Sequence, residues 1–178
     1  MSFHLLLASS SPYRAELLKR LRIPFSQASP DIDETPRSDE TPSEYVLRLA
    51  QGKAWALRPE HPESWIIGSD QTCVVDGQPV GKAGTEAKAL EQLKRVKGQK
   101  ITFLTGLCLL SPDGSEFTLT EPFHVHFNDL PDEALQRYIR IEQPLDCAGS
   151  FKVEGLGITL FSALEGRDMN ALIGLPMI

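Results

Sequence analysis

Hydrophobic positions along the chain change between the spacing of a strand and that of a helix. The first apolar run, Phe3–Ala8, has the length and composition of a buried strand. Apolar residues at helical spacing follow in Pro12–Leu21, where Ser11 is placed to cap the helix and Pro12 occupies its first position. A strand that leads directly into a helix is typical of an α/β fold.

The middle of the chain continues this alternation. Ala28–Ser43 is polar, rich in Asp, Pro and Ser, and is predicted to be a loop. The capping-box pattern Thr41-Pro42-Ser43-Glu44 then opens a helix that we expect to end near Leu57. Trp65–Val75 has the composition of a central strand, and Asp76-Gly77 is expected to turn the chain back.

Strands cluster in the second half of the chain. The pattern predicts helices at Thr85–Val96 and Pro131–Ile141, strands at Ile101–Leu110, Phe117–Phe127 and Gly157–Phe161, and the start of a last helix. We therefore expect residues 1–178 to form a single domain of mixed α/β class. The sequence stops directly after Gly174-Leu175-Pro176, so a C-terminal helix is expected to be cut short.

Composition excludes several classes of protein. The net charge is −6, which argues against a nucleic-acid surface because such surfaces need a basic patch. No apolar run approaches the ~20 residues that cross a bilayer, and the N-terminus lacks the basic start of a signal peptide. Cys73, Cys108 and Cys147 form no C-x-x-C motif, so we expect free thiols in a reducing, cytoplasmic compartment.

Charged residues interrupt the apolar pattern at three places, the first of which is Arg14. Arg14 shares a helix face with Leu17, Leu18 and Leu21. A cation at a helix N-terminus opposes the macrodipole unless an anion is bound there. The pattern therefore indicates either a phosphate site built from the Ser9-Ser10-Ser11 hydroxyls and Arg14, or a solvent-facing arginine after an ordinary capped turn.

Lys53 and Asp70 are the other two interruptions. Lys53 falls inside the apolar stripe of its helix, where it either snorkels to water or points into a pocket. Asp70 lies in the middle of a predicted central strand. Metal coordination, a nearby cation or a raised pKa can stabilise a carboxyl group there, and each is typical of an active site. The alternative is a strand that bends to solvent at Gly68.

Acidic residues in the loop before the second helix suggest a metal site. Asp31, Asp33 and Glu34 offer hard oxygen ligands with no cysteine or histidine cluster nearby, which suits Mg²⁺ or Mn²⁺ better than Zn²⁺. His124 and His126 share one face of a strand and could pair on a metal. They have no third partner at useful spacing, so an ordinary strand surface is favoured.

Lys82 and Lys152 supply two further cations beside glycine-containing loops, and no P-loop motif is present. Together with these residues, short segments in chain order resemble the signature of the Maf family of nucleotide pyrophosphatases. They are Leu7–Arg14, Asp33-Glu34, Lys53-Ala54, Gly68-Ser69-Asp70-Gln71, Gly81-Lys82, Thr105-Gly106, Ala148–Lys152, Glu154-Gly155 and Gly174-Leu175-Pro176. The segments Asp33–Glu40, Ser69-Asp70-Gln71 and Cys147–Gly155 are most similar to the subgroup that acts on 7-methyl-GTP.

The resemblance implies a fold like that of inosine triphosphatase: a long, mixed, twisted sheet flanked by helices, with two lobes and a central cleft. It also implies a homodimer and a divalent cation, Mg²⁺, Mn²⁺ or Co²⁺. By position, Asp70 resembles the general base and Glu34 a second acidic residue, and both are implied as metal ligands. The implied phosphate-binding set is Ser9, Arg14, Lys53, Lys82 and Lys152.

The resemblance further implies that Tyr13, Gln71 and Glu154 select the base. N7-methylation makes guanine positive, and an aromatic ring such as that of Tyr13 attracts a cation. Glu154 can accept hydrogen bonds from the guanine N1–H and N2–H₂ edge. In this subgroup tryptophan commonly stands where this chain has Tyr13, and the family often has proline where Ala83 follows Lys82.

The expected reaction is metal-assisted attack of water on the α-phosphate of 7-methyl-GTP, which yields 7-methyl-GMP and diphosphate. One alternative is a Maf-type enzyme for dTTP or UTP, against which Tyr13, Gln71 and Glu154 argue. Another is a non-catalytic nucleotide-binding regulator of cell division. The complete set of Asp70, Glu34 and the cations favours catalysis.

Overall fold

The computed structural model describes residues 4–178, and the chain divides into two compact units. Unit 1 comprises the chain up to Gln71, Leu104–Glu121 and Asp168–Ile178, and unit 2 comprises Thr72–Phe103 and Pro122–Arg167. In the predicted first strand, Leu5–Ala8 is confirmed, and Phe3 lies outside the described residues.

Helices and strands alternate as a mixed α/β chain. The helices are α1 (Pro12–Lys19), α2 (Pro42–Leu57), α3 (Glu86–Val96), α4 (Asp132–Glu142) and α5 (Met169–Ile173), with a 3₁₀ helix η1 at Leu156–Leu160. The strands are β1 (Leu5–Ala8), β2 (Ser26–Ala28), β3 (Trp65–Val75), β4 (Gln78–Val80), β5 (Lys100–Leu110), β6 (Glu116–Phe127) and β7 (Phe161–Gly166).

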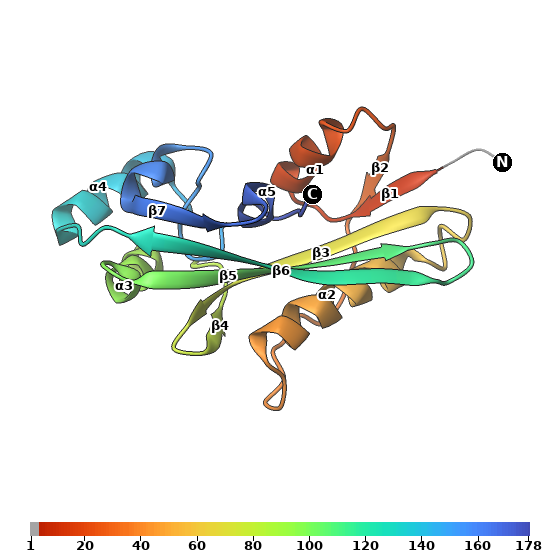
Figure 1. Ribbon diagram of the computed structural model, residues 1–178, viewed down its shortest axis with the longest axis horizontal. Helices are drawn as coiled ribbons and strands as arrows, with labels where there is room; N and C mark the ends of the chain where they lie inside the picture. Colours follow the sequence, from red (N-terminus) through yellow and green to blue (C-terminus); the bar gives the residue numbers. More distant parts are fainter. Residues whose placement is uncertain (1–3) are drawn as a thin grey trace. The chain divides into compact units, whose positions relative to one another are not determined.

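The strands of residues 4–178 form one mixed sheet in the order β2-β1-β3-β5-β6-β7, with β4 paired to β3 (Figure 1). β1 is parallel to β2 and β3, whereas β4 is antiparallel to β3 and β7 is antiparallel to β6. The turn predicted at Asp76-Gly77 joins β3 to β4, with both residues at positive φ as a tight hairpin turn requires.

The core of unit 1 is organised around β1. Leu6 and Ala8 pack in one cluster with Ala50 and Ala54 of α2. Leu5 and Leu7 pack in another cluster with side chains of α1. Because successive strand residues point to opposite faces, α1 and α2 cover opposite faces of β1 (Figure 1).

Two glycines let α2 approach the sheet closely. A Cβ atom at Gly68 of β3 would collide with the carbonyl oxygen of Ala50, and one at Gly106 of β5 would collide with that of Val46. β3 runs without interruption over Trp65–Val75, so the alternative of a bend to solvent at Gly68 is wrong. The glycine allows contact with the helix instead of marking a bulge.

Four phenylalanine rings form the centre of unit 2. Phe151 stacks edge to face on Phe103, Phe127 and Phe161, with ring centroids 4.8 to 5.9 Å apart. Such pairs contribute about 1 kcal/mol each beyond the area they bury. The cluster anchors the loop at Phe151, directly before Lys152.

Two sequence predictions about elements are corrected by the structure. The first helix ends at Lys19, so Leu21, expected on its inward face, is 49% exposed. Gly157–Phe161, expected to be a strand, is mostly the 3₁₀ helix η1, and the strand β7 begins only at Phe161. The apolar run at these residues is too short for the spacing of apolar positions to distinguish a strand from a 3₁₀ helix.

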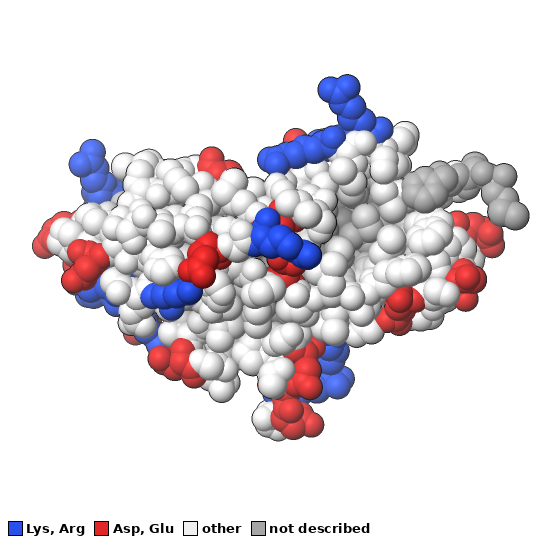
Figure 2. Space-filling model, viewed as in Figure 1, with Lys and Arg blue, Asp and Glu red and all other residues white. Residues whose placement is uncertain are grey.

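The surface carries charges of both signs. On the face shown in Figure 2, basic and acidic side chains are interspersed. Among residues 4–178, no helix combines the length and apolar character needed to span a membrane.

Candidate functional site

The N-terminus of α1 gathers hydroxyl groups and a guanidinium group. The Ser11 hydroxyl accepts a hydrogen bond from the Arg14 amide, as expected for an N-cap. The buried Ser9 hydroxyl accepts one from the Ser11 amide at 3.1 Å and one from Nη1 of Arg14 at 3.3 Å. This clustering of donors at a helix N-terminus suits an anion.

Arg14 is partly buried and faces the protein. Its Nε donates to the carbonyl oxygen of Gly174 at 2.7 Å. Burial lowers the pKa of the Arg14 guanidinium, and the negative charges of Asp70 and Glu34 act in the opposite direction. Arg14 therefore lies within the field of both acidic residues, and the solvent-facing alternative is wrong.

Lys53 joins the two carboxylates that the family resemblance implies as metal ligands. Its Nζ lies 2.6 Å from Oδ1 of Asp70 and 2.8 Å from Oε1 of Glu34. Lys53 is 7% exposed and Asp70 8% exposed, so the lysine is paired and does not snorkel. A nearby cation is thus the stabilising partner of the mid-strand aspartate, because a buried carboxylate needs a compensating charge.

Side chains of α2 fix the loop that carries Glu34. The Tyr45 hydroxyl donates to the Glu34 carbonyl oxygen at 3.0 Å. Arg48 donates to both carboxylate oxygens of Glu40 and to the Thr35 carbonyl. Burial raises the pKa of Tyr45 to about 12, helped by the charges of Asp70 and Glu34.

Sequence reasoning missed Tyr45 and Arg48. A signal existed for Tyr45, because it precedes Lys53 by two helical turns and so lies on nearly the same face of α2. No comparable signal existed for Arg48, since its partner Glu40 lies in an irregular loop.

Ser69 and Gln71, on either side of Asp70, contact the C-terminal part of the chain. Nε2 of Gln71 donates to the carbonyl oxygens of Ala171 at 2.6 Å and Leu172 at 2.9 Å. The buried Ser69 hydroxyl lies 2.9 Å from the Gly174 carbonyl oxygen. Both amide hydrogens of Gln71 are used in this way, so any contact of Gln71 with a base falls to its side-chain oxygen.

The remaining expected site residues lie in unit 2. An isolated backbone bridge pairs Lys82 with Ala148 and so joins two loops of this unit. Nζ of Lys152 donates to the Glu142 carbonyl oxygen at 3.4 Å and lies 4.0 Å from Oδ1 of Asp146. Lys82 and Glu154 are exposed.

The expected residues thus fall into two sets. The set in unit 1 is Ser9, Tyr13, Arg14, Glu34, Lys53, Asp70 and Gln71, and the set in unit 2 is Lys82, Lys152 and Glu154. Ser9 contacts Arg14, and Glu34 and Asp70 both contact Lys53, while Tyr13 lies partly buried on α1.

The described residues contain no group of three or more His, Cys, Asp and Glu side chains that could hold a metal ion. Glu34 and Asp70 nevertheless converge on one cation, the Lys53 ammonium. Two carboxylates of this kind would supply hard oxygen ligands to a divalent cation.

The two histidines of β6 have polar neighbours on the strand surface. Nδ1 of His124 lies 3.0 Å from the Thr102 hydroxyl, and Nε2 of His126 lies 3.2 Å from Glu165. These contacts fit the interpretation of an ordinary strand surface.

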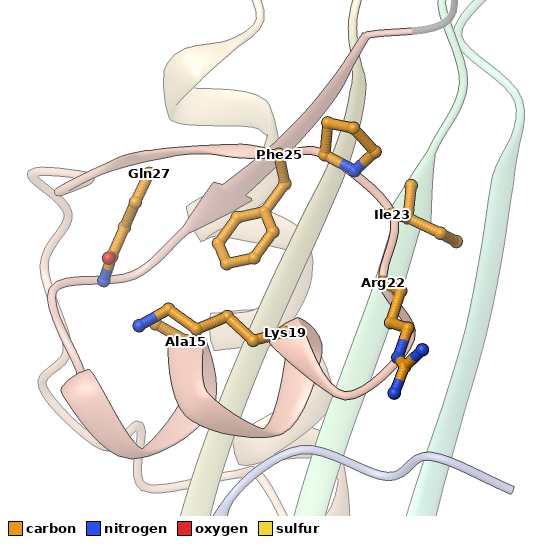
Figure 3. Close-up of a pocket in the computed structure, with 7 residues that line it drawn as sticks. Ala15, Lys19, Arg22, Ile23, Phe25 and Gln27 are labelled. Carbon is orange, nitrogen blue, oxygen red and sulfur yellow. The ribbon is translucent and has the colours of Figure 1, made fainter.

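A pocket of about 550 Å³ opens in unit 1 beside α1 and β2. Figure 3 shows Lys19 and Phe25 among its lining side chains, with Arg22 and Gln27 also contributing. Neither Asp70 nor Glu34 lines it. It adjoins the N-terminal part of α1, because Ala15 lines it and Nε2 of Gln27 donates to the carbonyl oxygens of Ser9 at 2.7 Å and of Ser11 at 3.4 Å.

Comparison with known proteins connects these observations to a family. The sequence profile described as Maf-like protein matches residues 4–178. A curated 7-methyl-GTP pyrophosphatase of Alcanivorax borkumensis is 54% identical over 175 residues, which cover 98% of this chain and 89% of that protein.

Two solved structures resemble the chain to different degrees. A HAM1 protein from Coxiella burnetii superposes with a TM-score of 0.52 at 15% identity, covering 86% of this chain and 89% of that one. The Staphylococcus aureus Ham1 protein gives a TM-score of 0.47 at 16% identity, covering 71% of this chain and 72% of that one. The expected α/β fold, an open mixed sheet flanked by helices, is confirmed.

Proposed function

Because this chain belongs to the Maf family, we propose that it hydrolyses 7-methyl-GTP to 7-methyl-GMP and diphosphate. The 54% identity to a relative of that name supports the substrate. The observation that carries the chemistry is the Lys53 ammonium between the carboxylates of Asp70 and Glu34, at 2.6 and 2.8 Å. A buried, charged carboxylate beside a cation is typical of a hydrolytic site.

In the proposed reaction, the oxygen of water attacks the α-phosphorus and the bond from this phosphorus to the bridging oxygen of the β-phosphate breaks. Asp70 accepts the proton that the water loses, and diphosphate leaves. Pairing with Lys53 keeps the Asp70 carboxylate charged and oriented. Such a reaction depends mainly on positioning and charge neutralisation.

The phosphates require positive charge, which the proposed binding set supplies: Ser9, Arg14, Lys53, Lys82 and Lys152. The N-terminus of α1 adds amide donors and the positive end of the helix dipole. Arg14 is suited to this role because its planar guanidinium matches phosphate oxygens.

Glu34 and Asp70 would hold a divalent cation, Mg²⁺, Mn²⁺ or Co²⁺, that arrives with the nucleotide. When bound, this ion neutralises charge on the phosphate oxygens. Removal of the cation with EDTA is therefore expected to stop turnover.

Base selection is assigned to Tyr13, Gln71 and Glu154. The Tyr13 ring can stack on the positively charged methylated guanine, and the exposed Glu154 carboxylate can accept hydrogen bonds from its N1–H and N2–H₂ groups. We also propose that the enzyme works as a cytoplasmic homodimer. The free thiols of Cys73, Cys108 and Cys147 fit a reducing compartment, and sedimentation would test the dimer.

The function is tested by measuring diphosphate release from 7-methyl-GTP, GTP, UTP and dTTP with each divalent cation. Asp70→Asn is expected to lower turnover at least ~1000-fold in a protein that still folds, because the amide is isosteric but a poor base. The thermal unfolding temperature should fall, because the buried Lys53 ammonium keeps only Glu34 as an anionic partner. Asp76→Asn, at an exposed carboxylate paired with Arg95, is the control and should keep full turnover. Near-normal turnover in Asp70→Asn would exclude the assigned role.

Base selection is tested separately by Glu154→Ala. We expect kcat/KM for 7-methyl-GTP to fall about 10-fold relative to UTP, because hydrogen bonds to a charged group are lost. Glu133→Ala, at an exposed position in the first turn of α4, should leave the ratio unchanged. A wild-type preference for UTP or dTTP would contradict the proposed substrate.

A further inference from the structure

The C-terminal segment Asp168–Pro176 has no role in the reaction proposed above, yet it contacts Arg14 and both sequence neighbours of Asp70. The Gly174 carbonyl oxygen accepts a hydrogen bond from Nε of Arg14 at 2.7 Å and lies 2.9 Å from the Ser69 hydroxyl. The carbonyl oxygens of Ala171 and Leu172 accept from Gln71. All these residues belong to unit 1.

The segment is itself held firmly. Asp168 is 1% exposed, and its carboxylate accepts hydrogen bonds from the amides of Asn170 and Ile178, each at 2.9 Å, and from that of Met177. Burial acts to raise the pKa of Asp168, but these amide hydrogen bonds outweigh it and lower the pKa. Leu175 is 2% exposed and packs in the core cluster of α1 and β1. These contacts therefore hold the Gly174 carbonyl in a fixed position.

Position 174 also requires glycine. Gly174 has a φ of +128°, a conformation that residues with a side chain rarely adopt. A Cβ atom there would lie 3.3 Å from Nε of Arg14. The backbone conformation and the closeness of Arg14 therefore both favour glycine at position 174, whose carbonyl oxygen accepts the hydrogen bond from Arg14.

From this geometry we propose that the Gly174 carbonyl is a positioning group that orients the Arg14 guanidinium for the triphosphate. The guanidinium of Arg14 is planar. Hydrogen bonds from Nε to the Gly174 carbonyl and from Nη1 to the Ser9 hydroxyl therefore fix the plane of the whole group. The donors that remain are then oriented before substrate arrives, which lowers the entropic cost of binding. The inference rests on the proposed function, because Arg14 is assigned to phosphate there.

A double-mutant cycle tests it. Alanine keeps the backbone carbonyl but rarely adopts a φ of +128°, so Gly174→Ala is expected to shift this carbonyl away from Arg14. The KM for 7-methyl-GTP should then rise about 10-fold while kcat changes less than about 3-fold, because a hydrogen bond to a charged group is lost. In an Arg14→Ala background, Gly174→Ala should raise the KM for 7-methyl-GTP by less than about 2-fold. Gly77→Ala is the matched control: Gly77 also has positive φ, +76°, but nothing lies within 4 Å of its added Cβ, so KM should not change.

Additive effects of Arg14→Ala and Gly174→Ala would overturn the proposal, as would an unchanged KM in Gly174→Ala. If circular dichroism shows that Gly174→Ala does not fold, Arg14→Lys decides, because lysine keeps the charge but has no Nε–H in the fork geometry. Its KM is expected within about 3-fold of that of Arg14→Ala. A wild-type KM in Arg14→Lys would overturn the proposal.

A measurement without substrate separates this inference from the proposed function. In NMR spectra of the nucleotide-free protein, the Arg14 Nε–H should exchange slowly with water, and it should exchange fast in Gly174→Ala but not in Gly77→Ala. Fast exchange in an active wild type overturns the inference and leaves the proposed function intact. Slow exchange in a wild type that hydrolyses no nucleotide overturns the proposed function and retains the contact between Arg14 and Gly174.

Discussion

At the scale of single residues, the charged side chains of the site compensate one another by pairing. Lys53 and Asp70 each occupy a position where the pattern calls for an apolar side chain, and the structure pairs them at 2.6 Å. A buried ion pair of this kind adds little net stability, because desolvation offsets the attraction. Its value lies in holding a carboxylate charged and oriented, as the proposed hydrolysis requires.

Glu40 provides a test of the loop that carries Glu34. A hydrogen bond from Arg48 is the largest cause that lowers the pKa of Glu40 to about 2 from an ordinary 4.5. Because the folded pKa is the lower one, the stabilisation is fully present above about pH 4.5 and is lost as the pH falls towards about 2. We expect an NMR titration of the Glu40 carboxyl carbon to show a midpoint near 2.

In Arg48→Met the Glu40 midpoint should return towards 4.5. Glu165, whose pKa is lowered to about 2 chiefly by Lys100, serves as an internal control and should keep its midpoint in the same variant. A Glu40 midpoint near 4.5 in the wild type would contradict the observed pairing with Arg48.

Residue patterns predicted some of these groups and not others. Arg14, Lys53 and Asp70 were visible because a charge in an apolar stripe is unusual in sequence. The carbonyl of Gly174 could not be found in this way, because every residue has a carbonyl and only the folded chain places this one against Arg14.

At the scale of elements, the pairing of Lys53 with Asp70 depends on how closely α2 packs on β3. Gly68→Ala places a methyl group against the Ala50 carbonyl, so α2 must move away from the strand. We expect a loss of roughly 3 kcal/mol in the free energy of unfolding, measured by urea denaturation. Turnover should fall as well, because the helix that moves carries Lys53.

Gly52→Ala in the same helix is the control. Its added Cβ would be 3.4 Å from the Ile32 side chain, and alanine favours the helix by about 1 kcal/mol, so stability should rise or stay unchanged. Equal stability of the Gly68→Ala protein and the wild type would show that the close contact is not required.

Long, strongly patterned elements were predicted well. α2 begins with the expected capping box, and β3 has the expected bounds. The short strand β2 was missed because it has only three residues and two of them are exposed. The 3₁₀ helix η1 was taken for a strand because its apolar run contains β-branched residues. The close approach of Gly157 to the Lys152 backbone, in the loop just before η1, leaves no periodicity in the sequence.

At the scale of the whole molecule, β3, β5 and β6 each contribute residues to both compact units. Releasing one half of such a strand would leave its backbone groups unpaired, which is costly. We therefore expect the two units to lose structure in one cooperative transition.

The three cysteines report on this transition. Burial raises the pKa of Cys73 and Cys147 to about 12 and that of Cys108 to about 11, so the folded thiols should react slowly with a thiol reagent at neutral pH. Cys73 and Cys147 lie in unit 2 and Cys108 in unit 1. With increasing urea, mass spectrometry should show all three labelled at the same midpoint, and separate midpoints would contradict cooperative unfolding.

The loop around Phe151 has a consequence for how such enzymes diversify. Ser150, Phe151 and Val153 are buried, while Glu154 points to solvent. Inward positions are constrained by the aromatic cluster, whereas an outward position can be exchanged without disturbing the core. If Glu154 selects the base as proposed, exchange of this outward side chain would change which base is accepted and leave the buried scaffold as it is.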